Sequence, residues 1–170
     1  MNLTDFIRPV PDFPKPGILF RDITPLLAHP EAVAMAVRGL AAPWQDAGIT
    51  AVAAVEARGF LFAGPLALEL DVGLIPVRKP GKLPADTIAH EYDLEYGRDT
   101  LEMHRGILAP GARVLIVDDV LATGGTADAC TKLIKAAGAV VAGAAFLLEL
   151  EALGGRARLA PHRVEALVRY

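Results

Sequence analysis

The chain has 170 residues, of which 53% are hydrophobic and 22% charged, and its formal net charge is −3. This composition is typical of a globular domain with a buried core, and it excludes an intrinsically disordered chain. Without a broad basic surface we expect no nucleic-acid partner. We also expect no membrane partner, because the longest uncharged apolar run, residues 136–148, is shorter than the roughly 20 residues of a spanning helix.

The only cysteine, Cys130, excludes an internal disulfide and fits a reducing compartment. The first residues, M-N-L-T-D-F-I-R, lack the charged and then apolar pattern of a secretory signal. We therefore expect a cytoplasmic location, with Cys130 as a small buried residue on a helix.

Near-continuous runs of Val, Ile, Leu and Ala predict four strands that are covered on both faces, at residues 50–55, 73–77, 113–117 and 139–148. Helices are predicted over residues 30–47, 60–70 and 126–137. Pro43 should kink or end the first of them, and Gly138 should cap the last. This alternation predicts one α/β domain over residues 1–170, with a mainly parallel twisted sheet flanked by helices.

The segment from Lys79 to Asp99 interrupts this alternation. It is polar, carries Gly81 and Gly97 near its ends, and lacks helical periodicity. A connection of that length in a compact domain is usually either a functional flap or a disordered segment. We expect a flap, in which residues 87–92 and 99–104 pair as a small hairpin over the sheet.

Charged residues gather where three predicted strands end: Arg58 after the first, Arg78 and Lys79 after the second, and Asp118 and Asp119 after the third. Parallel α/β sheets bind ligands beyond the carboxyl ends of their strands, so these residues predict one site. Two adjacent carboxylates are costly unless a cation or a polyhydroxylated ligand meets them. The alternative is a structural pair satisfied by backbone N–H groups.

The loop A-T-G-G-T, residues 122–126, follows the two aspartates and leads into a predicted helix. Its glycines let backbone N–H groups converge, and the helix adds its positive end, which predicts a phosphate site. The alternative is a plain tight turn; a Walker A loop and the pattern G-x-G-x-x-G do not occur. Taken together, the residues call for a ligand with a phosphate, a hydroxylated sugar and a second anionic group, which describes phosphoribosyl pyrophosphate (PRPP).

The strand and loop V-L-I-V-D-D-V-L-A-T-G-G-T resemble the PRPP signature of the type I phosphoribosyltransferases. Four other segments resemble the adenine phosphoribosyltransferase family: F-P-K-P-G-I-L-F-R-D-I-T-P-L-L, E-A-R-G-F-L-F-A-G-P-L-A, R-K-P-G-K-L-P and L-E-Y-G. The resemblance runs from residue 13 to residue 170. It implies the type I phosphoribosyltransferase fold, with a flexible flap over residues 79–99 and an N-terminal hood that binds the base.

The resemblance also implies an activity, in which adenine and PRPP give AMP and pyrophosphate in purine salvage through an oxocarbenium-like transition state. It implies Mg²⁺ as cofactor, held mainly by PRPP or pyrophosphate and water with no direct protein ligand, and a homodimer. The implied catalytic residues are Glu95, Arg58, Asp118 and Asp119. The implied PRPP-binding residues are Arg58, Arg78, Lys79, Lys82, Tyr96, Asp118, Asp119, Ala122, Thr123, Gly124, Gly125 and Thr126. The implied adenine-binding residues are Leu19, Phe20 and Arg21.

Several alternatives remain open at the level of sequence. Residues 18–20 would also suit a simple core segment, and Glu95 a solvated loop. The stretch F-L-L-E-L-E, residues 146–151, holds carboxylates and lacks the lysine with which related enzymes read a 6-oxopurine, which favours adenine over xanthine without excluding the latter. A non-catalytic regulator that senses PRPP is disfavoured by the acidic charge and by the few residues before position 13.

Overall fold

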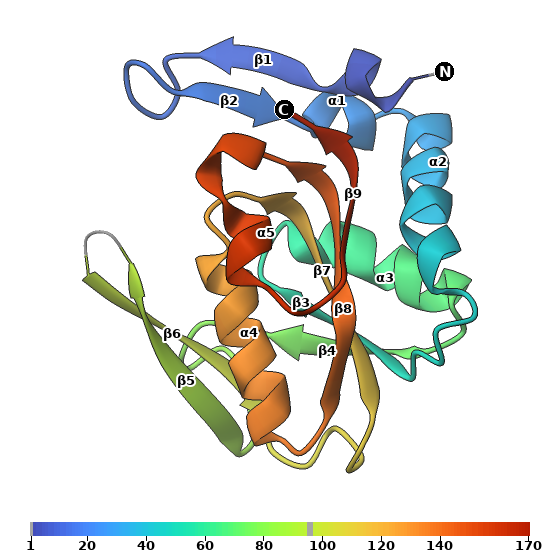
Figure 1. The fold of residues 1–170 in the computed structure, drawn as a ribbon, viewed down its shortest axis with the longest axis vertical. Coiled ribbons are helices and arrows are strands. Elements are labelled where there is room, and N and C mark those ends of the chain that lie inside the picture. The colour runs from blue at the N-terminus through green and yellow to red at the C-terminus, as the bar shows by residue number, and fades with distance from the viewer. Residues whose placement is uncertain (1, 95–96) are drawn as a thin grey trace.

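The computed structural model describes residues 2–94 and 97–170, and only the backbone of Leu94. A five-stranded sheet runs through the centre of the molecule in the order β4-β3-β7-β8-β9, and every neighbouring pair is parallel (Figure 1). Its strands are β3 (Ala51–Val55), β4 (Gly73–Val77), β7 (Arg113–Leu121), β8 (Val140–Glu149) and β9 (Val164–Arg169). The mainly parallel α/β sheet predicted from the apolar runs is therefore confirmed.

Helices cover both faces of this sheet. One face carries α2 (Pro30–Ala41) and α3 (Gly59–Glu69), and the other carries α4 (Gly125–Ala136). Two short helices, α1 (Thr24–Leu27) and α5 (Gly155–Arg158), and the 3₁₀ turns η1 (Leu3–Phe6), η2 (Ala42–Trp44) and η3 (Glu151–Leu153) complete the helical elements of the described residues. None of these helices is long and apolar enough to cross a membrane.

Two antiparallel hairpins lie outside the sheet. The first pairs β1 (Arg8–Pro11) with β2 (Leu19–Asp22), and the second pairs β5 (Thr87–Leu94) with β6 (Gly97–His104). The predicted pairing of residues 87–92 with 99–104 is thus confirmed. The second hairpin packs on the α4 side of the sheet beside β4, where Leu101 and Met103 are fully buried.

The structure differs from the sequence expectations in three respects. The helix expected over residues 30–47 ends at Ala41, because Pro43 cannot donate a helical hydrogen bond and residues 42–44 tighten into η2. Strand β7 continues to Leu121, so Asp118 and Asp119 lie within the strand and not after it. Strands β1, β2 and β9 and the short helices α1 and α5 were not predicted.

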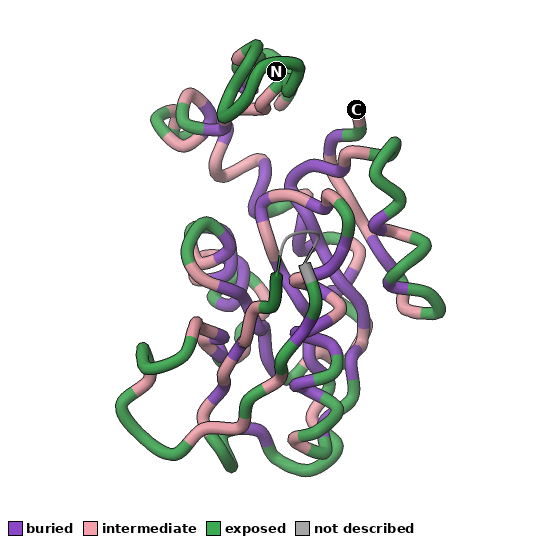
Figure 2. The backbone as a smooth tube through the Cα atoms, turned by 90° about the vertical axis from the view of Figure 1, so that its left-hand side faces the viewer, coloured by how far each residue is buried: buried purple, intermediate pink, exposed green. Residues whose placement is uncertain are grey.

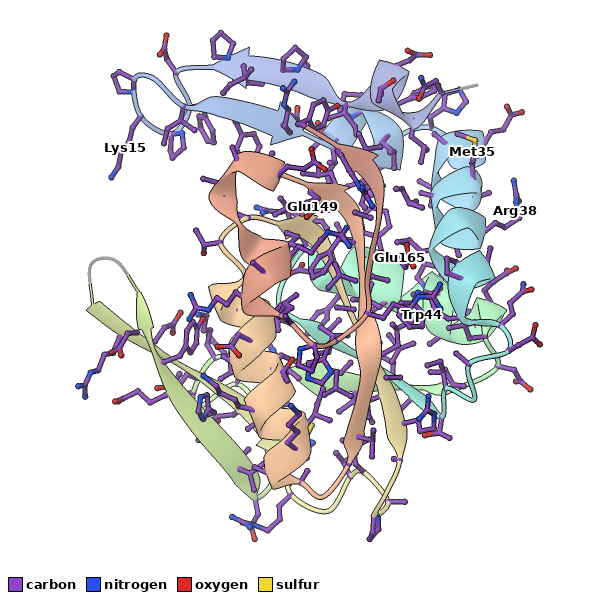
Figure 3. The ribbon with its side chains drawn as sticks, in the orientation of Figure 1. Lys15, Met35, Arg38, Trp44, Glu149 and Glu165 are labelled. Carbon is purple, nitrogen blue, oxygen red and sulfur yellow. The ribbon has the colours of Figure 1, made fainter. Side chains whose placement is uncertain are left out.

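The buried residues form two hydrophobic clusters, one between the sheet and α4 and the other between the sheet and helices α2 and α3, and Figure 2 shows the buried stretches of backbone. Trp44 closes the end of α2 with 2% of its surface exposed (Figure 3). Cys130 on α4 is fully buried, as expected, and burial raises the pKa of its thiol to about 12. The sheet and its helices thus form a rigid support for the loops at the carboxyl ends of the strands.

Candidate active site

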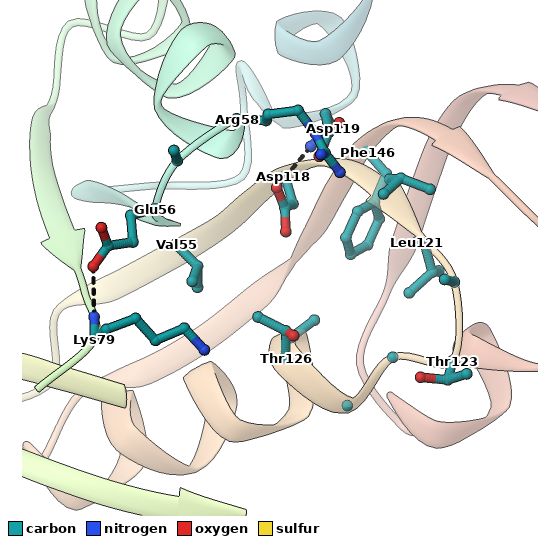
Figure 4. Close-up of a pocket in the computed structure, with 16 residues that line it drawn as sticks. Val55, Glu56, Arg58, Lys79, Asp118, Asp119, Leu121, Thr123, Thr126 and Phe146 are labelled. Carbon is teal, nitrogen blue, oxygen red and sulfur yellow. Dashed lines mark hydrogen bonds and ion pairs between the residues drawn. The ribbon is translucent and has the colours of Figure 1, made fainter. Parts of the chain in front are cut away.

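A cavity of about 350 Å³ opens at the carboxyl ends of β3 and β7 (Figure 4). Four parts of the chain line it, and they contribute Val55, Glu56, Ala57, Arg58, Lys79, the run from Asp118 to Ala127, and Phe146. The sequence placed one ligand site at this edge of the sheet. The cavity brings together Arg58, Lys79, both aspartates and the whole A-T-G-G-T loop.

The loop of residues 122–126 turns directly into α4. Gly124 has a left-handed φ of 80° and is the N-cap residue, and the first helical hydrogen bond runs from the Asp128 N–H to the Gly124 carbonyl. The N–H groups of residues 125–127 therefore have no acceptor within the helix. Because they border the cavity at the positive end of a twelve-residue helix, they suit an anion such as phosphate.

The back of this loop is packed against α5. A Cβ added to Gly155 would lie 2.3 Å from the Ala122 carbonyl oxygen, and one added to Gly124 would lie 2.8 Å from the Gly155 carbonyl oxygen. Only glycine fits at either position without a backbone shift. Two segments about 30 residues apart thus hold the loop in place.

The paired aspartates differ in their surroundings. Asp119 is 5% exposed and its Oδ2 accepts a hydrogen bond of 2.6 Å from Arg58 Nε, whereas Asp118 Oδ1 accepts one of 2.9 Å from the Asp119 N–H. Removal from solvent, and then the charge of Asp119, raise the pKa of Asp118 to about 8. The cation expected beside the pair is therefore Arg58, which forms an ion pair with Asp119.

Glu56 joins the loops that follow β3 and β4. Its carboxylate accepts hydrogen bonds from the Lys79 N–H at 2.6 Å and from Arg78 Nη2 at 3.2 Å. These bonds, the backbone one foremost, lower the pKa of Glu56. Arg78 Nη1 also donates to the Lys82 carbonyl at 3.1 Å, and neither Arg78 nor Lys82 lines the cavity. Arg78 therefore shapes the cavity wall, while Lys79 faces the cavity itself.

Comparisons with known proteins agree on one family. The phosphoribosyl transferase domain model matches residues 24–163. The adenine phosphoribosyltransferase of Roseiflexus castenholzii is 56% identical over 100% of this chain and 99% of the relative. The chain belongs to the adenine phosphoribosyltransferase family.

Solved structures of the family share the fold. The adenine phosphoribosyltransferase of Thermoanaerobacter pseudethanolicus superposes with a TM-score of 0.95 at 48% identity, covering 99% of this chain and 98% of that one. The Saccharomyces cerevisiae enzyme, solved with an iminoaltritol bisphosphate and adenine, gives a TM-score of 0.89 at 35% identity, covering 98% and 95%. The type I phosphoribosyltransferase fold expected from the sequence is thus confirmed.

The residues implied for adenine lie on the β1–β2 hairpin, which we call the hood. Leu19 is 49% exposed and Ile18 is 44% exposed, so the alternative of a simple core segment is wrong for both. Phe20 packs edge-on against Phe13, with ring centroids 5.1 Å apart, and the Arg21 guanidinium lies 3.7 Å from the centre of the Tyr170 ring. None of these residues lines the cavity, and their contact with adenine remains a prediction.

Two other implied residues, Glu95 and Tyr96, lie outside the described part of the chain. Sequence reasoning also missed lining residues. Phe146 is 1% exposed and is the register partner of Asp118 across the β7–β8 pair. Since opposite residues of a parallel pair face the same side of a sheet, alignment of the two apolar runs would have found it. Gly155 gave no comparable signal, because its contact is set by the placement of α5.

Proposed function

We propose that the chain transfers the phosphoribosyl group of PRPP to adenine, giving AMP and pyrophosphate, in purine salvage. The observation that carries this proposal is the cavity that holds the helix-capped loop of residues 122–126, two adjacent carboxylates and two cations from other strand ends. A ring nitrogen of adenine forms the new bond to C1′ of the ribose. The bond from C1′ to the pyrophosphate oxygen breaks, and its electron pair leaves with pyrophosphate.

The loop of residues 122–126 binds the 5′-phosphate through its backbone N–H groups and hydroxyls. Asp118 and Asp119 accept hydrogen bonds from the ribose hydroxyls and stabilise the oxocarbenium-like charge. The Arg58 guanidinium leaves Asp119 and pairs with pyrophosphate, to which Lys79 supplies a second charge. Arg78 and Lys82 contribute positive charge from behind the cavity wall. Each role rests on where these groups lie around the cavity.

The flat purine packs against a wall formed by Leu19, Phe20 and Arg21 of the hood. On the flap, Glu95 and Tyr96 approach the reacting centre. Glu95 is the group that exchanges the purine proton. Of the carboxylates in residues 146–151, which favoured adenine in the sequence, Glu149 is engaged elsewhere. Glu149 is 3% exposed and forms an ion pair of 2.6 Å with Arg156, at the end of β8 that lies toward the hood (Figure 3). Adenine is supported by the yeast relative, which was solved with that base.

Magnesium fits this site as an ion carried by the ligand. The described residues contain no group of three His, Cys, Asp or Glu side chains that would hold a metal. PRPP or pyrophosphate oxygens and water would therefore supply most of its coordination, beside Asp118 and Asp119. When bound, it offsets negative charge on the departing pyrophosphate.

The proposal extends to the setting of the enzyme. The whole chain acts as one phosphoribosyltransferase domain, with residues 79–99 as a flexible flap that excludes water from the reacting centre. We propose a homodimer in the cytoplasm, by family resemblance and because the single, buried Cys130 suits a reducing compartment.

The test is AMP formation from adenine, PRPP and Mg²⁺, with xanthine as competing base and a metal-free control. Asp119→Asn should lower the rate by roughly 10²-fold or more, because it removes a carboxylate charge where positive charge develops. Asp118→Asn should lower the rate as well, because it replaces a carboxyl group that faces the ribose hydroxyls. The matched control Asp71→Asn lies on an exposed turn after α3 and should keep the rate. Turnover of xanthine without adenine would overturn the base assignment, and PRPP binding without turnover would indicate a PRPP-sensing regulator.

A further inference from the structure

The Lys79 side chain is fixed at both ends. Its backbone N–H donates to Glu56 at 2.6 Å, and its ammonium forms an ion pair with Asp99 of β6. Figure 4 shows the side chain running from the end of β4 toward Thr126 at the start of α4. A lysine has a flexible four-carbon stem, so two fixed ends keep its charge in one place beside the cavity.

Asp99 is itself held by further donors. The Tyr92 hydroxyl donates to Asp99 Oδ2 at 3.2 Å, and the Thr100 N–H donates to Asp99 Oδ1 at 2.8 Å. Tyr92 is 7% exposed, and Lys79 Nζ lies 6.0 Å from the centre of its ring. The carboxylate therefore has little freedom to follow the lysine, and its position sets that of the ammonium.

Strand β6, which carries Asp99, is also hydrogen-bonded to the residue that follows β4. Arg78 and Glu102 form an antiparallel bridge, in which the Arg78 N–H donates at 2.9 Å and the Glu102 N–H donates at 2.7 Å. This bridge is adjacent to Lys79 in the chain and three residues from Asp99. The backbone bridge thus joins the end of β4, which borders the cavity, to the β5–β6 hairpin. The Lys79–Asp99 ion pair joins the same two segments next to this bridge.

We propose that Asp99 is a positioning residue, which orients the Lys79 ammonium for the pyrophosphate end of PRPP and couples it to the β5–β6 hairpin. This inference rests on the proposed function. Among the described residues that line the cavity, the basic side chains are Arg58 and Lys79, and both are paired: Arg58 with Asp119 and Lys79 with Asp99. In the proposed function Arg58 leaves its partner, whereas Lys79 keeps Asp99 and offers the remaining N–H donors of its ammonium to the anion.

Asp99 also favours the charged form of Lys79. Burial is the largest single influence and would lower the pKa of Lys79, but the hydrogen bond that the ammonium donates to Asp99, together with the electrostatic and hydrogen-bonding effects of Tyr92 and the charge of Asp99, raises that pKa. In return, the ammonium holds the pKa of Asp99 below its usual range. The pair is 39% and 25% exposed on its two side chains, so solvent screens it and its effect on binding is expected to be modest.

The test measures PRPP binding by calorimetry, which needs no turnover, together with KM for PRPP, KM for adenine and kcat. Asp99→Asn should weaken PRPP binding and raise KM for PRPP about fivefold, with KM for adenine and the melting temperature little changed. Asp93→Asn is the matched control, because Asp93 lies on the same hairpin and its side chain is 85% exposed. It should behave as the wild type.

A double-mutant cycle separates positioning from a general effect on the hairpin. In a Lys79→Gln background, Asp99→Asn should have no further effect on PRPP binding. Additive losses, or unchanged binding in Asp99→Asn alone, would overturn the inference. If wild-type protein binds PRPP and makes no AMP, the proposed function fails while this cycle still decides the role of Asp99; if it does not bind PRPP, both fail.

Discussion

Replacing Gly155 with alanine tests whether the packing behind the phosphate loop determines binding in front of it. The new Cβ would lie 2.3 Å from the Ala122 carbonyl oxygen and 3.0 Å from the Gly124 nitrogen. Carbon and oxygen atoms in ordinary contact are about 3.3 Å apart or more, so the loop or α5 must move by about 1 Å. Gly155 opens α5 and alanine suits a helix, so the change adds little backbone strain of its own.

Misplacement of a binding group by about 1 Å can lower an enzymatic rate by about 10²-fold. We expect kcat/KM for PRPP to fall roughly 10- to 100-fold in Gly155→Ala, mostly through KM for PRPP. The assay is steady-state AMP formation at varied PRPP, with circular dichroism to show that the variant is folded.

Gly73→Ala is the matched control. A Cβ on Gly73 would meet no atom within 4 Å, and this residue begins β4 at the edge of the sheet away from the cavity. This variant should retain the wild-type KM. If folded Gly155→Ala also retained it, the loop would not depend on α5, and the argument from close packing would be refuted.

Three further predictions concern the aspartate pair, the cavity floor and the hood. Because the pKa of Asp118 is raised in the folded chain to about 8, from an ordinary value near 4, the folded state holds a proton that the unfolded chain has lost between these values. The stability that this group contributes therefore falls as the pH rises through that window. Between pH 5 and pH 8, the melting temperature of Asp118→Asn should rise relative to that of the wild type by about 3 °C or more. A difference in melting temperature that stays constant with pH would contradict the raised pKa of Asp118. Phe146→Ala removes a buried ring that lines the cavity and should lower the free energy of unfolding by roughly 3–5 kcal/mol in urea titrations. Phe146→Leu should lose clearly less. A loss below about 1 kcal/mol in Phe146→Ala would show that the ring does not support this part of the cavity. Arg21→Ala removes the contact with the Tyr170 ring, which is worth about 0.5–1 kcal/mol, so hydrogen exchange in β1 and β2 should accelerate about two- to fivefold. Tyr170→Phe keeps an aromatic ring and should not accelerate it, and equal exchange in all three proteins would exclude this anchor.

The sequence predicted the strands correctly where a continuous apolar run is also buried in the structure. The strands at residues 51–55 and 73–77 are apolar throughout and were placed within one residue. Strand β9 was not predicted, because it lies at one edge of the sheet. Its half-buried sequence V-E-A-L-V-R lacks the long apolar run of a strand that is covered on both faces. Pro43 was identified as a break in the helix, but the sequence did not show that the helix ends at Ala41, where the chain tightens into η2.

For the site, sequence identified residues whose chemistry is visible in the residue type. Charges and glycines at the strand ends pointed to Arg58, Lys79, the aspartates and the phosphate loop, all of which border the cavity. It could not separate Arg78 from Lys79, since adjacent residues look equivalent until Glu56 is seen to engage the Arg78 guanidinium. The contacts of Gly155 and Asp99 are made across the fold, and no local pattern marks either residue.

The Arg58–Asp119 ion pair gives the cavity an internal counterion. With the proposed roles, PRPP does not meet bare carboxylates; the ribose hydroxyls take the place of a guanidinium, and that guanidinium turns to the pyrophosphate. Binding is then an exchange of partners, whose free energy is a difference between two similar contacts and not the full value of either. When pyrophosphate and AMP depart, the same exchange runs in reverse. With these proposed roles, we expect the pair to limit how tightly either product is held and so to favour turnover over retention.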